Sequence, residues 1–167
     1  MIPAADDRAA LSDLVVLSDL VVRYAHQVDH RRFADLGELF TADAELVLPD
    51  PPRNLEPVRR LAGRTEIVAA MGGLDGLVAT RHALHGQVVE VGEDPDSAIG
   101  SVVGEAHHLL NRPDGVVQDC VWFLRYEDRY QRGDGRWRFA RRRLTIDWIE
   151  YRDLGQVRGG PERTAHR

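Results

Sequence analysis

Hydrophobic positions in the first half of the chain recur with helical spacing. Between Leu11 and Asp29, apolar side chains return every three or four residues, which is the period of one helix face. Similar but shorter runs predict a second helix over Phe33–Phe40 and a third over Thr65–Met71, which the pair Gly72-Gly73 ends. The apolar positions of the first helix are Leu14, Leu17, Val21, Tyr24 and Val28.

The second half of the chain changes to long alternating runs that are separated by turn residues. A hairpin signal at Gly133-Asp134-Gly135 divides the last two runs. A shorter strand is predicted earlier, over Ala44–Leu48, and the proline-rich stretch from there to Ala62 is predicted to be a loop that forms a lid or a binding mouth. The four long predicted strands are Ala83–Val91, Ala98–Leu110, Val116–Tyr130 and Arg136–Trp148.

Helices followed by a meander of antiparallel strands predict an α+β fold. Strands of this length twist and curl, so helices that cover the concave face of the sheet would close a cone-shaped pocket. We expect one domain over residues 11–151, with a flexible N-terminus (1–10) and a loosely ordered C-terminal tail (152–167).

Composition excludes several function classes. The net charge of −5 argues against nucleic acid as the main partner, and no apolar run reaches the roughly 20 residues that a membrane helix needs. All basic side chains are arginine, which excludes Schiff-base chemistry on a lysine. The acidic N-terminus and the single cysteine, Cys120, favour a reducing cytoplasm over secretion.

Three side chains suggest acid–base chemistry. Asp29 falls where the first helix ends, His82 falls just before a predicted strand, and Tyr24 precedes Asp29 by five residues. A carboxylate that orients a histidine, with a phenol nearby, moves protons without a cofactor. The alternative is that Asp29 is solvated beside Arg31 and that the histidine is structural, and the residues alone leave both interpretations open.

Other chemistries find less support in the sequence. No Cys/His spacing matches a zinc site, and neither a phosphate-binding glycine loop nor a nucleophile elbow is present. Along a strand His85 should face away from His82, and at most one of His107 and His108 can point inward. We therefore expect no metal and no cofactor.

The order of several short motifs resembles the SnoaL-like proteins of the nuclear transport factor 2-like superfamily. The motifs are Tyr24-Ala25-His26-Gln27-Val28-Asp29, Thr80-Arg81-His82 and Asp134-Gly135-Arg136-Trp137-Arg138, and the resemblance covers roughly residues 11–151. The branch that holds scytalone dehydratase, bile acid 7α-dehydratase and hexachlorocyclohexane dehydrochlorinase is the most similar. Its members eliminate water or HCl without a cofactor.

This resemblance implies roles for particular residues. Asp29 and His82 would form the general base, Tyr24 would donate a proton or hydrogen bond, and His107 would be a second catalytic histidine. The implied substrate-binding residues are Tyr126, Trp122, Arg143 and Phe40. Because Leu124 and Tyr126 stand where scytalone dehydratase has small polar residues, we expect a different substrate, one that is small, largely apolar and polyketide-, terpenoid- or steroid-like.

The same resemblance leaves other functions open. A polyketide cyclase or an isomerase would share the proton-transfer step, and an epoxide hydrolase would need an Asp-Arg-Asp set of which only Arg143 and Asp147 are candidates. A non-catalytic partner similar to the β subunit of aromatic-ring dioxygenases would use the histidine structurally. The family also implies a homodimer or a homotrimer.

Overall fold

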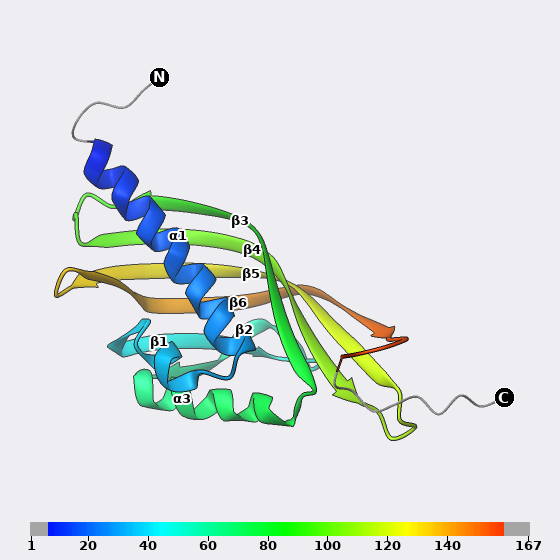
Figure 1. The fold of residues 1–167 in the computed structure, drawn as a ribbon. Helices are drawn as coiled ribbons and strands as arrows, with labels where there is room; N and C mark the ends of the chain where they lie inside the picture. The colour runs from blue at the N-terminus through cyan, green and yellow to red at the C-terminus, as the bar shows by residue number, and fades with distance from the viewer. Residues whose placement is uncertain (1–6, 159–167) are drawn as a thin grey trace.

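A computed structural model of the chain describes residues 7–158, and side chains from residue 11. One long helix lies across a strongly bent sheet, and two shorter helices cover the same side (Figure 1). The helical elements are α1 (Asp7–Asp29), α2 (Phe33–Gly37), α3 (Arg64–Met71) and a 3-10 turn η1 (Gly72–Gly76). The predicted α+β class is confirmed.

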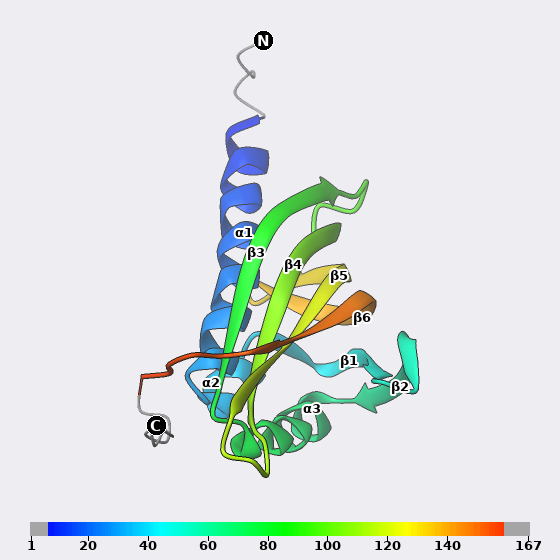
Figure 2. The same ribbon diagram turned by 90° about the vertical axis from the view of Figure 1, so that its right-hand side faces the viewer.

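Six strands form a single sheet in the order β2-β1-β6-β5-β4-β3. Neighbouring strands run antiparallel except β1 and β6, which pair in parallel. The sheet bends into an open cone, so its two edge strands, β2 and β3, lie on opposite sides of the interior (Figure 2). The strands are β1 (Phe40–Asp50), β2 (Asn54–Ala62), β3 (Ala79–Val91), β4 (Ser97–Asn111), β5 (Val117–Gly133) and β6 (Arg136–Asp153).

The buried face of α1 fills the wide part of the cone. Leu17, Val21 and Val28 are almost fully buried there against the inward-facing residues of the sheet. Near the N-terminal end of the helix, Asp13 accepts hydrogen bonds from Trp137 Nε1 (2.9 Å) and Arg132 Nη1 (2.9 Å). These bonds tie α1 to the β5–β6 hairpin. The C-terminal end of α1 is held beside β3 by the hydrogen bonds between Asp29 and His82.

Two sequence-based predictions about elements are wrong. The helix predicted over Phe33–Phe40 ends at Gly37, because Phe40 is fully buried and pairs with Phe139 at the start of β1. The loop predicted up to Ala62 is largely β2, an edge strand, where Pro57 is tolerated because only one side of the strand must be paired.

Element ends also extend beyond the predicted limits. Helix α1 begins at Asp7, and β3 begins at Ala79, so His82 lies inside a strand. Strand β6 reaches Asp153. Residues 1–6 and 159–167, which hold most of the predicted flexible termini, lie outside the described part. Within residues 7–158, no helix is long and apolar enough to span a bilayer.

Candidate active site

Asp29 and His82 meet where the end of α1 packs on β3. Asp29 Oδ1 lies 2.7 Å from His82 Nδ1, and its other oxygen accepts a hydrogen bond of 2.8 Å from the backbone N–H of His82. Thr80 donates a third hydrogen bond to this carboxylate and accepts one of 2.7 Å from Arg31. The two strongest sequence candidates are therefore in direct contact.

This contact determines the protonation of both groups. Burial raises the pKa of the Asp29 carboxyl, but hydrogen bonds from His82 and Thr80 outweigh burial and hold that pKa below its usual value. An ionised Asp29 only accepts, so the Nδ1 of His82 carries a proton, and in the neutral imidazole the lone pair is then on Nε2. No described residue forms a hydrogen bond with that Nε2.

A cavity of about 280 Å³ lies between α1, the turn after β1 and the inner face of the sheet. Its interior wall is mostly apolar, which suits a small hydrophobic ligand. Four polar side chains, from α1, β3, β4 and β5, interrupt that wall: Tyr24, His82, His108 and Tyr126. Asp50 and Arg59 are the charged residues of the lining, and the rest comprises Val28, Leu48, Pro49, Pro51, Ala70, Met71, Gly73, Leu74, Ala106, Trp122, Leu124 and Leu144.

Two tyrosines meet in this cavity as protonated phenols. The rings of Tyr24 and Tyr126 are in edge-to-face contact, with centroids 6.0 Å apart. Burial raises the pKa of both phenols, and the charge of Arg142 offsets this only in part. Neither hydroxyl bonds to another residue of the described chain, so both are available as hydrogen-bond donors.

A fully buried arginine lies behind the two tyrosines. The guanidinium carbon of Arg142 is 4.2 Å from the ring centroid of Tyr24 and 3.8 Å from that of Tyr126. Its Nε lies 3.4 Å from Asp128 Oδ1, and Asp128 accepts a hydrogen bond from Tyr130. Although burial disfavours its charge, Asp128 keeps the pKa of Arg142 above its usual value. The site therefore has a permanent positive charge under its phenols.

His108, not His107, is the second histidine of the cavity. Its ring packs against Trp122, with centroids 4.1 Å apart and planes inclined by 41°, and its Nδ1 donates to the carbonyl oxygen of Cys120 at 3.2 Å. Burial lowers the pKa of His108 to about 4, with a further lowering from His82. A neutral imidazole with an unprotonated Nε2 is thus held near His82.

Three other predicted site residues lie away from the cavity. His107 is on the opposite face of β4, where its Nδ1 is 2.7 Å from Asp119. Arg143 is on the outer face as well and donates to Glu127 at 2.8 Å. Phe40 is fully buried beneath Tyr24, with ring centroids 6.1 Å apart, and does not line the cavity. His85 faces outward toward Glu105, as its parity predicts.

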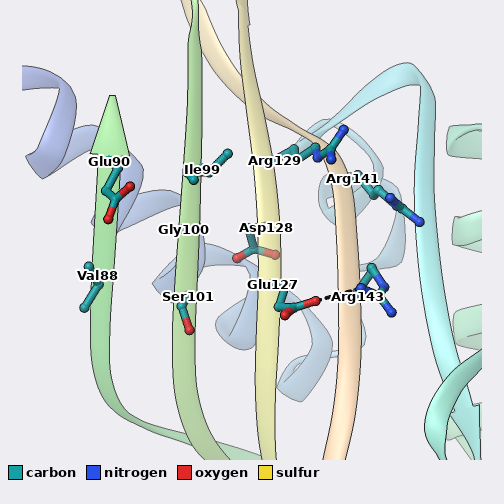
Figure 3. A pocket seen from close by; sticks show the side chains of 10 residues that line it. All are labelled: Val88, Glu90, Ile99, Gly100, Ser101, Glu127, Asp128, Arg129, Arg141 and Arg143. Carbon is teal, nitrogen blue, oxygen red and sulfur yellow. Dashed lines mark hydrogen bonds and ion pairs between the residues drawn. The ribbon is translucent and has the colours of Figure 1, made fainter. Parts of the chain in front are cut away.

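A second hollow, of about 370 Å³, lies on the outer face of the sheet. Figure 3 shows its mixture of charged side chains, including the ion pair between Glu127 and Arg143 that the dashed line marks. It contains no histidine or phenol, so it lacks the proton-transfer groups of the inner cavity. Among residues 7–158 there is also no cluster of three or more His, Cys, Asp or Glu that could hold a metal ion.

Comparison with solved structures places this fold among several bacterial proteins. A protein of Novosphingobium aromaticivorans DSM 12444, provisionally assigned as a scytalone dehydratase, is 20% identical (TM-score 0.73), covering 96% of this chain and 99% of that one. A hexachlorocyclohexane dehydrochlorinase (LinA-type3) from Novosphingobium barchaimii LL02 is also 20% identical (TM-score 0.69; 93% and 99% covered). The Kfla4162 protein from Kribbella flavida is 23% identical (TM-score 0.74; 84% and 95% covered).

At these identities the structural likeness shows the fold alone. No curated protein sequence matches the chain. The model of the SnoaL-like domain, in contrast, matches residues 9–143, which include most of α1, all of β1 to β5 and the first part of β6. The resemblance predicted from the sequence is confirmed, and the chain belongs to the SnoaL-like domain family.

Proposed function

We propose that this protein is a cofactor-independent lyase that eliminates water or a similar leaving group from a small, largely apolar substrate. The observation that carries the proposal is that Asp29 accepts hydrogen bonds from both the Nδ1 and the backbone N–H of His82. It leaves a basic Nε2 at the wall of an apolar cavity. Family membership, with dehydratase and dehydrochlorinase structures among the similar folds, supports the same reaction class.

The chemistry follows from the positions of the groups. His82 Nε2 removes a proton from the carbon next to a substrate carbonyl, and the C–H electron pair becomes an enolate. Tyr24 or Tyr126 donates a hydrogen bond to the enolate oxygen, while the charge of Arg142 favours the developing anion. The enolate then expels the leaving group from the next carbon, and the imidazolium of His82 returns its proton to that group.

A turnover assay with two matched histidine variants tests this proposal. A panel of apolar β-hydroxy ketones would be followed by the absorbance of the conjugated product. His82→Ala should reduce kcat by about 10²- to 10⁴-fold, which is the usual contribution of a general base. His107→Ala is the control, because His107 has the same kind of carboxylate partner on the outer face of the sheet.

The product and the variants decide between the open alternatives. A product lighter by one water molecule supports elimination, whereas a product of unchanged mass supports an isomerase with the same base. Equal turnover in His82→Ala and wild type would refute the assigned role of the dyad, whereas no turnover of any panel member by the wild type would favour a non-catalytic partner protein.

A further inference from the structure

We propose that the substrate of this cavity carries an anionic group, such as a carboxylate, and that Arg59 binds it at the cavity mouth. This inference rests on the proposed function only in taking the cavity as the substrate site. Arg59 belongs to β2, at the opposite edge of the sheet from the strand of His82. It lines the cavity together with residues of the turn that follows β1.

The register of β2 directs Arg59 toward the cavity and its neighbour away from it. Arg59 pairs with Leu48, and residues that pair across strands share a face. Leu48 is part of the cavity wall, so Arg59 extends that wall outward. Arg60 pairs with Val47 and forms an ion pair with Glu45 on the other face. Two adjacent arginines therefore have different environments.

The guanidinium of Arg59 lacks a partner within the described chain. Its neighbours along β2 and the preceding turn are neutralised, since Arg60 binds Glu45 and Arg53 lies 3.4 Å from Asp50. The side chain of Arg59 forms no ion pair or hydrogen bond with residues 7–158. Asp50 also lines the mouth, but its ion pair with Arg53 offsets its charge. Arg59 thus leaves a net positive charge at the entrance.

The other charges near the cavity are already engaged. The Asp29 carboxylate is held by His82, and Arg142 is paired with Asp128 below the phenols. Among the described residues that line the cavity, Arg59 is therefore the cation without a partner, and it lies at the mouth and not beside the base. With its charged end on Arg59, a substrate would extend its apolar body across the cavity toward His82 on the far wall.

Two fluorescent probes that differ by one charged group test this assignment. Anilinonaphthalene sulfonate carries a sulfonate, which stands for the substrate carboxylate, and N-phenylnaphthylamine is its uncharged analogue. Arg59→Gln should weaken sulfonate binding by about five- to tenfold while the neutral probe binds as before, since a charge-assisted hydrogen bond is lost. Arg59→Lys should restore most of the sulfonate affinity, and added salt should weaken it in the wild type.

Arg60→Gln is the matched control, because it removes an adjacent arginine from the opposite face of β2. The proposal is overturned if Arg59→Gln leaves sulfonate binding unchanged, if it weakens both probes equally, or if neither probe binds the wild type. Probe binding requires no turnover, so the Arg59 variants report on the anion site alone. An absent role for Arg59 is therefore distinguishable from a failed lyase mechanism, which the turnover assay alone reports.

Discussion

His108 is a residue whose charge state depends on its burial. The pKa of this histidine is about 4 in the folded protein and about 6.5 when exposed. Between these values the unfolded chain binds a proton that the folded protein excludes. The free energy of unfolding therefore falls as pH decreases from 6.5 toward 4, by up to about 3 kcal/mol, and this group adds no further change below that range.

We expect His108→Gln to remove this pH dependence. Urea unfolding at pH 7 and pH 5 would show a smaller loss of stability for the variant than for the wild type. His26→Gln is a suitable control, because His26 is exposed on α1. A wild-type loss that the His108 variant reproduces in full would contradict the assignment.

Residue identity and spacing predict most of the site. The end of α1 at Asp29 agrees with the sequence-based prediction, and Asp29 contacts His82 there, although β3 begins at Ala79 and not at Ala83 as predicted. The choice between His107 and His108 could have been made from strand parity, since His108 shares its parity with the buried Ala98, Val102 and Ala106. The parity of one strand was thus an unused signal.

The sequence does not show which side chains of β6 face the interior of the sheet, because the strand contains a bulge. Arg129 pairs with Arg141, but Tyr130 pairs with Phe139, so the ladder skips Ala140. This bulge turns Arg142 inward and Arg143 outward. A bulge depends on the partner strand, and no local pattern marks it. The Arg141-Arg142-Arg143 run therefore resembles a solvated surface segment although its middle residue is fully buried.

The register of β6 predicts unequal effects for neighbouring arginines. Arg142→Met should destabilise the protein by about 3–5 kcal/mol, because it leaves Asp128 buried without its partner. The double variant Arg142→Met/Asp128→Asn should regain much of that loss, and Arg143→Met should change stability by less than about 0.5 kcal/mol. Equal costs for the two single variants in urea unfolding would show that the register is different.

Close contact between β3 and β4 depends on a glycine. A Cβ at Gly104 would lie 2.6 Å from the carbonyl oxygen of Ala83, next to the bulge where the register of these strands shifts. We expect Gly104→Ala to lower the free energy of unfolding by about 1–3 kcal/mol. Gly86→Ala, which meets no atom within 4 Å, should be nearly neutral, and a similar cost for both would argue against this contact.

Strand β2 shows why element prediction failed in one segment. Its proline and charged residues resemble a loop, and its pairing is confined to one neighbouring strand. An edge strand needs neither a continuous apolar run nor a full set of N–H donors. The four long strands, by comparison, were predictable because each alternates over many residues between strong turn signals.

At the scale of the whole molecule, the outer face of the sheet is the surface that we expect to pair in a homo-oligomer. It combines exposed apolar side chains with Glu90 on β3 and with Arg141 and Arg143 on β6, so two copies related by a two-fold axis can oppose unlike charges. The apolar side chains are Val88, Ile99, Val103 and Trp148.

Ile99→Glu should reduce a dimer or trimer to a monomer, as light scattering after size-exclusion chromatography would show. Val22→Glu is the control, because Val22 is equally exposed but lies on α1 (53% for Ile99 and 55% for Val22). A wild type that elutes with the mass of one chain would contradict the expectation.

The parallel pairing of β1 with β6 has a consequence for folding during synthesis on the ribosome. Strand β1 holds its sheet position only through a partner made about a hundred residues later, and β2 is attached through β1. A nascent chain that has emerged as far as β5 already contains Asp29 and His82, but it lacks the strand that joins the two sides of the cone. The part of the cavity that β1 and β2 form is therefore assembled last. A chain that lacks β6 contains the Asp29–His82 pair but not the complete cavity.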